Sequence, residues 1–158
     1  MKLSVVKENM SKGLICVAMD APMEEAASLM EQYRIRHLLV VDGRGGVVGI
    51  LSDRDVNRAI DSETNRFPEG ANPATFMAWP VLTVLDSASL ADVAQGMIDE
   101  KVSAFLVVTR DDSIVGIITS EDLLKQLVAI LSAPSPAERI TYSPLIGEFV
   151  RDLQSVGI

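Results

Sequence analysis

Histidine and cysteine are scarce in this chain, which has one residue of each among 158. A lone Cys16 excludes an intrachain disulfide and any cluster of cysteine metal ligands. No second histidine, no Cys-His pair and no serine beside a plausible base is present, which argues against nucleophilic catalysis. No ligand spacing suggests a zinc or calcium site. We therefore expect a protein that is not an enzyme, holds no metal and requires no cofactor.

Basic residues are also in deficit, since 14 Lys and Arg face 22 Asp and Glu, for a net charge of −8. The field of such a protein repels a polyphosphate backbone, so we expect no binding to nucleic acid. No apolar run approaches the ~18 residues that a spanning helix needs, and the first residues lack the apolar stretch of a signal peptide. These features predict a cytoplasmic protein without membrane insertion.

Aromatic residues make up only 4% of the chain, whereas apolar residues in total make up 48%. This composition is typical of a folded protein with buried sheets flanked by helices. The length allows one compact domain or two small halves that share a core. A regulatory role would therefore act on another chain.

The sequence contains an internal repeat. Residues 10–60 and 77–127 align at a constant separation of 67 without a gap, and twelve of the 51 pairs are identical. The identical pairs include Gly49 with Gly116 and Asp55 with Asp122. A match of this length and register predicts two copies of one structural unit.

Each copy predicts the same order of elements. A short apolar segment precedes a helix whose apolar residues recur at i, i+3, i+4 and i+7, and two strands and a second helix follow. The turn sequences "DGRGG" and "TRDDS" favour a hairpin between the two strands. The expected fold class is α/β of the α+β type, with two β-α-β-β-α repeats packed with pseudo-twofold symmetry. The strands are expected at 14–17, 38–41 and 47–51 and at 81–84, 105–108 and 114–118.

We divide the chain into four parts: 1–61, the first repeat with an N-terminal segment; 62–75, a polar linker; 76–132, the second repeat; and 133–158, a C-terminal extension. In the extension, Ser143 before Pro144 is a good helix start, and apolar residues follow at helical spacing. That predicted helix packs either on its own module or on a second subunit or client.

Both copies end their last strand in a similar motif, "GILSDRDV" at 49–56 and "GIITSEDL" at 116–123. Ser52 or Thr119 can cap the following helix, with Asp55 or Asp122 returning the bond to the cap amide. The same positions suit a nucleotide, because a helix N-terminus attracts phosphate and a carboxylate accepts from both ribose hydroxyls. The residues by themselves leave both interpretations open.

With the repeat, these motifs resemble the signature of the cystathionine β-synthase (CBS) domain, in which Gly, two apolar residues, Thr or Ser, two variable residues and Asp close each copy. The resemblance covers residues 10–131. It implies a tandem pair, or Bateman module, a type of module that commonly binds AMP, ADP, ATP or S-adenosylmethionine between repeats and often forms dimers.

The resemblance also implies roles for matched residues. Ser52 and Thr119 would contact ribose or phosphate, and Asp55 and Asp122 would accept bonds from the ribose hydroxyls. The family often has proline in the strands where this chain has leucine, at 39 and 106, which alters a local backbone contact. The base pockets would be lined by backbone near Cys16 and Thr83 and around His37 and Phe105.

The two copies differ in charge. The first supplies Arg54 in its motif and Arg36 with His37 at the start of a strand, where the second has Glu121, Ser103 and Ala104. Arg54 either clamps a phosphate or pairs with a neighbouring aspartate, and His37 either contacts phosphate or lies at an edge. We hypothesise that these three basic residues belong to one pocket, which takes the phosphorylated nucleotide.

The function expected is that of a ligand-sensing regulatory module. An adenosyl nucleotide would bind between the repeats and modulate a client protein or the arrangement of a homodimer. AMP, ADP or ATP is favoured over S-adenosylmethionine. The alternative is a dimerising interaction scaffold in which the motifs act only as caps.

Overall fold

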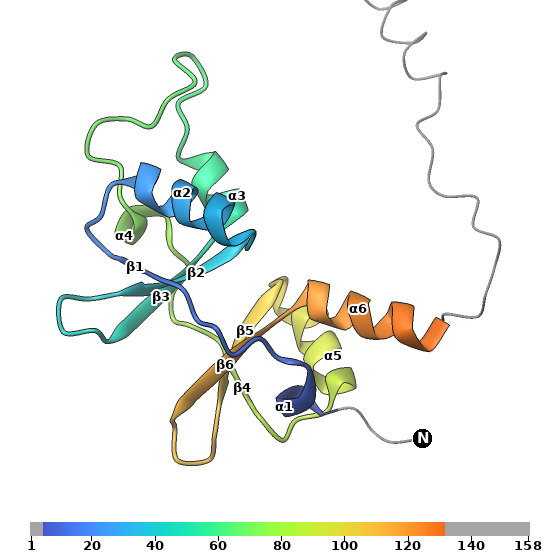
Figure 1. Ribbon diagram of the computed structural model, residues 1–158. Coiled ribbons are helices and arrows are strands. Elements are labelled where there is room, and N and C mark those ends of the chain that lie inside the picture. Colours follow the sequence, from blue (N-terminus) through green and yellow to red (C-terminus); the bar gives the residue numbers. More distant parts are fainter. Residues whose placement is uncertain (1–4, 132–158) are drawn as a thin grey trace, which may run out of the picture. The chain divides into compact units, whose positions relative to one another are not determined.

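The computed structural model describes residues 5–131 (Figure 1). The packing divides the chain into one unit of residues 1–127, which contains both repeats, and a second unit from residue 128 onward. The extension 133–158, with the helix predicted from Ser143, lies outside the described residues.

Each repeat forms one three-stranded sheet with its helices, which confirms the expected fold class. The first strand pairs parallel to the middle one, which pairs antiparallel with the third. Equivalent strands keep the same register, since Val17 faces Val40 as Val84 faces Val107. The first repeat comprises β1 (Cys16–Ala18), α2 (Met23–Tyr33), β2 (His37–Val41), β3 (Val47–Ser52) and α3 (Asp53–Arg58). The second comprises β4 (Thr83–Leu85), α5 (Leu90–Glu100), β5 (Ala104–Val108), β6 (Ile114–Thr119) and α6 (Ser120–Leu131).

Both predicted hairpins are present between the second and third strands of each repeat. In the first, the Asp42 carboxylate accepts bonds from the amides of Arg44 and Gly46, at 2.9 and 2.8 Å. Gly45 has φ +80, a left-handed conformation that glycine adopts without strain. In the second hairpin, Asp112 holds the left-handed position with φ 62, so residues 111–112 form the turn that the sequence predicts.

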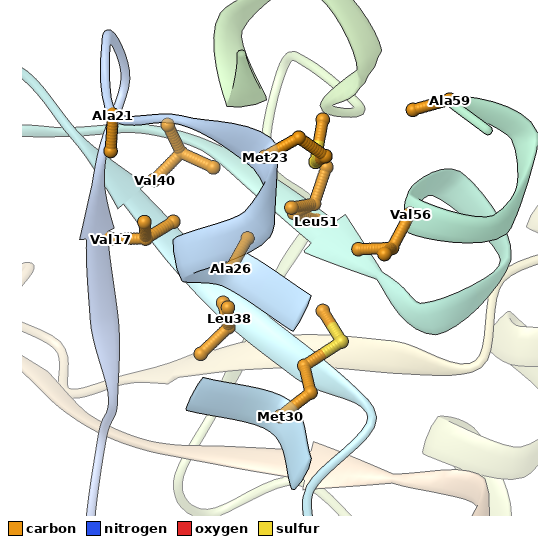
Figure 2. Packing of buried hydrophobic residues seen from close by; sticks show 10 residues of the cluster. All are labelled: Val17, Ala21, Met23, Ala26, Met30, Leu38, Val40, Leu51, Val56 and Ala59. Carbon is orange, nitrogen blue, oxygen red and sulfur yellow. The ribbon is translucent and has the colours of Figure 1, made fainter. Parts of the chain in front are cut away.

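The core of the first repeat lies between its sheet and helices α2 and α3. Met23, Ala26 and Met30 come from one face of α2, as the helical spacing predicts (Figure 2). They pack on Leu38 of β2 and Leu51 of β3. The other side of β2 carries Leu39, which is also buried but lies outside this cluster. Burial on both faces explains why β2 is a continuous apolar run.

The first few described residues pack against the second repeat. Helix α1 (Val6–Asn9) lies beside α5 in Figure 1. The amide of Val6 donates to the carbonyl of Ala88 at 3.0 Å, and its side chain joins the core with Val93 and Phe105. The N-terminal segment therefore covers the core of the second repeat, although the sequence order assigns it to the first.

The segment from 62 to 75 has a similar role for the first repeat. It contains the start of helix α4 (Pro73–Phe76), which Asn72 caps through a 3.2 Å bond from the amide of Thr75. Pro73 is buried, and Phe67 packs against the core of the first repeat. This stretch is thus more than the polar linker that its composition predicts.

The two repeats meet where the chain leading into one of them crosses the last strand of the other. Ser11 and Ile117 exchange two backbone bonds of 2.9 Å, and Ala78 and Ile50 exchange bonds of 2.9 and 3.1 Å. The crossing is close because the adjacent residue of each last strand is glycine. A Cβ at Gly116 would lie 2.7 Å from the carbonyl oxygen of Ser11.

The two motif glycines should therefore differ in their tolerance of a methyl group. Gly116→Ala should lower the free energy of unfolding by about 1–3 kcal/mol, because its Cβ meets a paired backbone carbonyl. Gly49→Ala should lower it less, because its Cβ meets only the flexible side chain of Met77. Urea denaturation measures both values. Gly43→Ala, in open space, is the control, and equal losses at all three positions would contradict the explanation.

Candidate functional site

Two cavities open between the repeats, and each is built from both of them. The larger, of about 350 Å³, combines Ser52 and Asp55 of the first repeat with Ser103 and the segment 79–82 of the second. The smaller, of about 130 Å³, combines the Thr119 motif of the second repeat with residues of the first. The motif of one repeat thus faces the start of the middle strand of the other.

The cavities are related by the internal repeat. Thirteen of the fifteen residues that line the larger one have their partner, 67 positions away, in the lining of the smaller one. The exceptions are Trp79 and His37, and His37 lines both cavities. The pseudo-twofold relation therefore extends from the fold to the candidate sites.

Both motifs form complete caps. The carboxylate of Asp55 accepts from the amide of Ser52 at 2.8 Å and from its hydroxyl at 2.6 Å. The Thr119 motif repeats this arrangement at 2.9 and 2.8 Å. Ser89 forms a related cap with Asp92 at the start of α5, but neither residue lines a cavity. Capping therefore accounts for the motif geometry, and only the position of two motifs beside cavities points to a ligand.

A chain of hydrogen bonds crosses the larger cavity from the first repeat to the second. The guanidinium of Arg54 donates to the hydroxyl of Ser103 at 3.3 Å, and the same hydroxyl lies 3.0 Å from Nε2 of His37. Because arginine can only donate, the hydroxyl accepts from Arg54. The hydroxyl donates to Nε2 of His37 when that nitrogen is unprotonated, and accepts from it through its second lone pair when it carries a proton.

The structure does not bring the expected basic cluster together. Arg54 lines the larger cavity, Arg36 lines the smaller one, and only His37 lines both. The cause is the crossed construction, in which a motif and the middle strand of the same repeat contribute to different cavities. Arg54 also does not pair with its neighbouring aspartates: its charge lies within 4.0 Å of no carboxylate among residues 5–131, and Asp55 pairs with Arg58 at 2.9 Å.

Ion pairs occupy the polar side of the smaller cavity. Glu121 lies 3.0 Å from Lys125 and 4.0 Å from Arg36. The bond from Lys125 lowers the pKa of the Glu121 carboxyl and raises the pKa of the lysine. Asp122, which is buried, lies 4.0 Å from the same lysine. Two cations of this cavity, Arg36 and Lys125, thus already face carboxylates within the protein.

The lining includes backbone next to three of the positions named for the base pockets. Ile15, Leu82 and Ala104 are lining residues, and each immediately precedes one of those positions. Cys16, Thr83 and Phe105 themselves line neither cavity, and Phe105 belongs to the core of the second repeat.

Leu39 and Leu106, at the positions where the family often has proline, hold the lining residues Ile15 and Leu82 by backbone hydrogen bonds. Leu39 N–H donates to the carbonyl of Ile15, and Leu106 N–H donates to that of Leu82, both at 3.0 Å. A proline has no N–H to make this bond. The altered backbone contact is therefore an added hydrogen bond that fixes each lining segment to the middle strand.

Several lining residues were not identified from the sequence. Arg34 and Lys101 end α2 and α5 in the left-handed conformation, with φ 52 and 58, which places a cation at each cavity. Arg58 and Lys125 lie one helical turn after the motifs. The sequence did contain a signal for these residues, because Arg34 and Lys101, and likewise Arg58 and Lys125, are basic residues separated by the repeat length of 67.

Among residues 5–131, no group of three or more histidine, cysteine, aspartate or glutamate side chains is arranged to hold a metal ion. Within the same range, no helix is both long and apolar enough to cross a membrane.

Comparison with known proteins identifies the family. The model of the CBS domain matches residues 4–62 and 74–129. A CBS domain-containing protein of Dictyostelium discoideum is 28% identical over 142 residues, which cover 84% of this chain and 97% of that protein. The chain belongs to the CBS domain family and contains two copies of the domain.

Other relatives show the domain pair in larger and in ligand-bound proteins. L-aspartate semialdehyde sulfurtransferase of Methanocaldococcus jannaschii is 30% identical over 77% of this chain, which spans only 23% of that protein. A CBS domain pair solved with 5-methylthioadenosine and S-adenosyl-L-methionine has a TM-score of 0.70 and 27% identity, over 81% of this chain and 98% of its own. CBSX2, solved with AMP, has a TM-score of 0.64 and 24% identity, over 80% and 97%.

The position of His37 predicts a pH-dependent stability. Burial, the largest cause, lowers the pKa of His37 from 6.5; Asp53 and Asp55 act in the opposite direction, and Arg36 and Arg54 lower it further. The unfolded chain binds the proton near pH 6.5, whereas the folded chain resists it to lower pH. The stability from the neutral imidazole is therefore present above pH ~6.5 and is lost as the pH falls toward the folded pKa.

Proton NMR measures this directly, because one histidine gives one imidazole C2 signal. We expect a titration midpoint below 6.5, and urea denaturation should show a smaller loss of stability below that pH in His37→Gln than in the wild type. A midpoint at or above 6.5 would contradict the neutral, Ser103-bonded imidazole.

Proposed function

We propose that this protein is a ligand-sensing regulatory module that binds AMP, ADP or ATP in the larger cavity. The observation that carries this proposal is that the larger cavity combines Ser52 and Asp55, a motif suited to ribose, with the guanidinium of Arg54. Among residues 5–131, no carboxylate lies within 4.0 Å of that guanidinium. Adenosyl ligands of the related domain pairs support the nucleotide class. The module acts without catalysis of its own.

The charges of the two cavities favour the larger one for the phosphate groups. It is lined by Arg54, Arg58 and Lys101 with the single carboxylate of Asp55. The smaller one has three cations but two carboxylates, and its motif carries Glu121, which pairs with Lys125 and lies 4.0 Å from Arg36, where the motif of the larger one carries Arg54. A less anionic adenosyl group, such as S-adenosylmethionine, is better suited to the smaller cavity.

A ligand in either cavity contacts both repeats and can therefore distinguish between their arrangements. Phosphate would replace the hydroxyl of Ser103 as the acceptor of the Arg54 bond and release His37 from the chain of hydrogen bonds. This gives the bound and free states different contacts between the repeats, which a regulatory shift requires. The output would be a change in a homodimer or in a client protein of the cytoplasm.

The second candidate function is a dimerising scaffold that binds no physiological nucleotide. The complete caps favour it, because they explain Ser52 and Thr119 without a ligand. Ile98 of α5 and Leu124 and Leu127 of α6 are exposed apolar side chains that suit a second copy. Mass measurement under native conditions, with and without nucleotide, tests the dimer in both proposals.

Nucleotide binding should depend on Arg54. In a thermal-shift panel of adenosine, AMP, ADP, ATP and S-adenosylmethionine, the phosphorylated ligands should raise the melting temperature of protein freed of co-purified nucleotide. By calorimetry, Arg54→Ala should weaken ATP binding about tenfold or more and adenosine binding little, because a charge-assisted bond is lost. Arg44→Ala, in the exposed hairpin, is the matched control. Two sites of equal ATP affinity that are insensitive to Arg54→Ala would reject the assignment.

A second test separates ligand contact from capping. Asp55→Ala and Asp92→Ala each remove an aspartate from a Ser-x-x-Asp cap. Asp92→Ala should lower the free energy of unfolding by about 1 kcal/mol, and Asp55→Ala by more, because Asp55 also accepts from the amide of Ser52 and pairs with Arg58. Only Asp55→Ala should also abolish ATP binding, because only Asp55 lines a cavity. Calorimetry below the melting temperature of each variant measures the affinity. Unchanged ATP affinity in Asp55→Ala would favour the scaffold.

A further inference from the structure

Trp79 lines only the larger cavity, and its partner in the repeat lines neither cavity. Trp79, the only tryptophan of the chain, lines the larger cavity while 73% of its surface is exposed. The matched residue of the first repeat is Lys12, which lies outside the lining of the smaller cavity. A large aromatic surface left uncovered at a cavity is a feature of binding sites rather than of cores.

The backbone around Trp79 is fixed on both sides. Immediately before it, Ala78 exchanges two hydrogen bonds with Ile50 of β3. Three residues after it, the carbonyl of Leu82 accepts the bond from Leu106. The indole is therefore attached to a short segment held by the sheets of both repeats, which limits the conformational entropy lost when a ligand orders it.

The remainder of the lining divides by chemistry according to its origin. The motif and α3 of the first repeat supply the hydroxyl, carboxylate and guanidinium groups, whereas the segment that contains Trp79 continues with Pro80, Val81 and Leu82, which are apolar. A ligand with an anionic end and a flat apolar end fits this division. A nucleotide has both, and its base has a face that can stack on indole.

We propose that Trp79 is the base-stacking residue of the larger cavity and makes this cavity select ligands that carry an aromatic base. The inference rests on the proposed nucleotide function and deepens it. Stacking accepts any base, so Trp79 selects for the presence of a base and leaves the choice among bases to other groups. The smaller cavity lacks this selection because Lys12 stands at the matched position.

Fluorescence tests the proposal in the intact chain, since Trp79 is the only indole. Titration with ATP should quench its emission saturably, because the stacked adenine covers the ring. Tripolyphosphate and ribose 5-phosphate, which have no base, should not quench it at concentrations that calorimetry shows to be saturating. Saturated ATP binding in the larger cavity without a change in emission overturns the proposal.

Substitution separates stacking from a structural role. By calorimetry, Trp79→Ala should weaken ATP binding roughly tenfold or more. It should leave ribose 5-phosphate affinity within about twofold, whereas a general disruption of the cavity would weaken both. Trp79→Phe should retain most of the ATP affinity, and Lys12→Ala, the matched control, should retain all of it. Equal losses for ATP and ribose 5-phosphate overturn the stacking role.

Two outcomes distinguish a failure of this inference from a failure of the proposed nucleotide function on which it rests. If the wild type binds no ATP, the proposed function and the inference fail together. If it binds ATP with Arg54 dependence while Trp79→Ala binds equally well, only the inference fails. A third outcome also overturns the inference. In it, the emission changes with protein concentration in the absence of ATP, and Trp79→Ala abolishes the dimer mass. These results would show that a second copy covers the indole.

Discussion

The close crossing of the chain over the last strand of each repeat is the constraint on which the candidate sites depend. At Gly49 and Gly116 the absence of a side chain lets the chain that leads into the other repeat pair with the strand edge. This pairing places Val81 and Leu82 beside the motif of the first repeat, and Leu14 and Ile15 beside that of the second. Without it, each motif would only cap a helix, as Ser89 does on α5.

The repeat pattern predicted the order of the strands and helices, because apolar periodicity and hairpin turns are local signals. The first strand of each repeat begins two residues later than expected, at Cys16 and Thr83. It also predicted both caps, since a Ser-x-x-Asp motif specifies its own geometry. The crossing was not predictable in this way. Whether Val6 covers its own repeat or the other depends on the path of the chain between two cores of similar composition, and no local pattern encodes that path.

The same nonlocal property explains why the expected basic cluster is divided. Arg36 and Arg54 belong to one repeat and are close in sequence, so a repeat considered alone places them together. Because each cavity takes its motif from one repeat and its middle strand from the other, Arg54 instead meets Ser103, and Arg36 meets Glu121. A site therefore has to be built from residues of both repeats, and a single repeat does not predict which residues meet.

The two pairs that join the repeats, Arg54 with Ser103 and Arg36 with Glu121, explain the difference in charge between the cavities. In the smaller cavity the anion of the motif, Glu121, faces a cation of the other repeat, Arg36, at 4.0 Å. In the larger cavity the cation in the motif faces a hydroxyl, which accepts its bond but carries no charge. Exchange of that hydroxyl for phosphate gives the charged guanidinium an acceptor of opposite charge in place of a neutral one, and such a bond is stronger. Two substitutions between otherwise similar repeats, at 54/121 and 36/103, thus account for the difference in charge pairing between the two cavities.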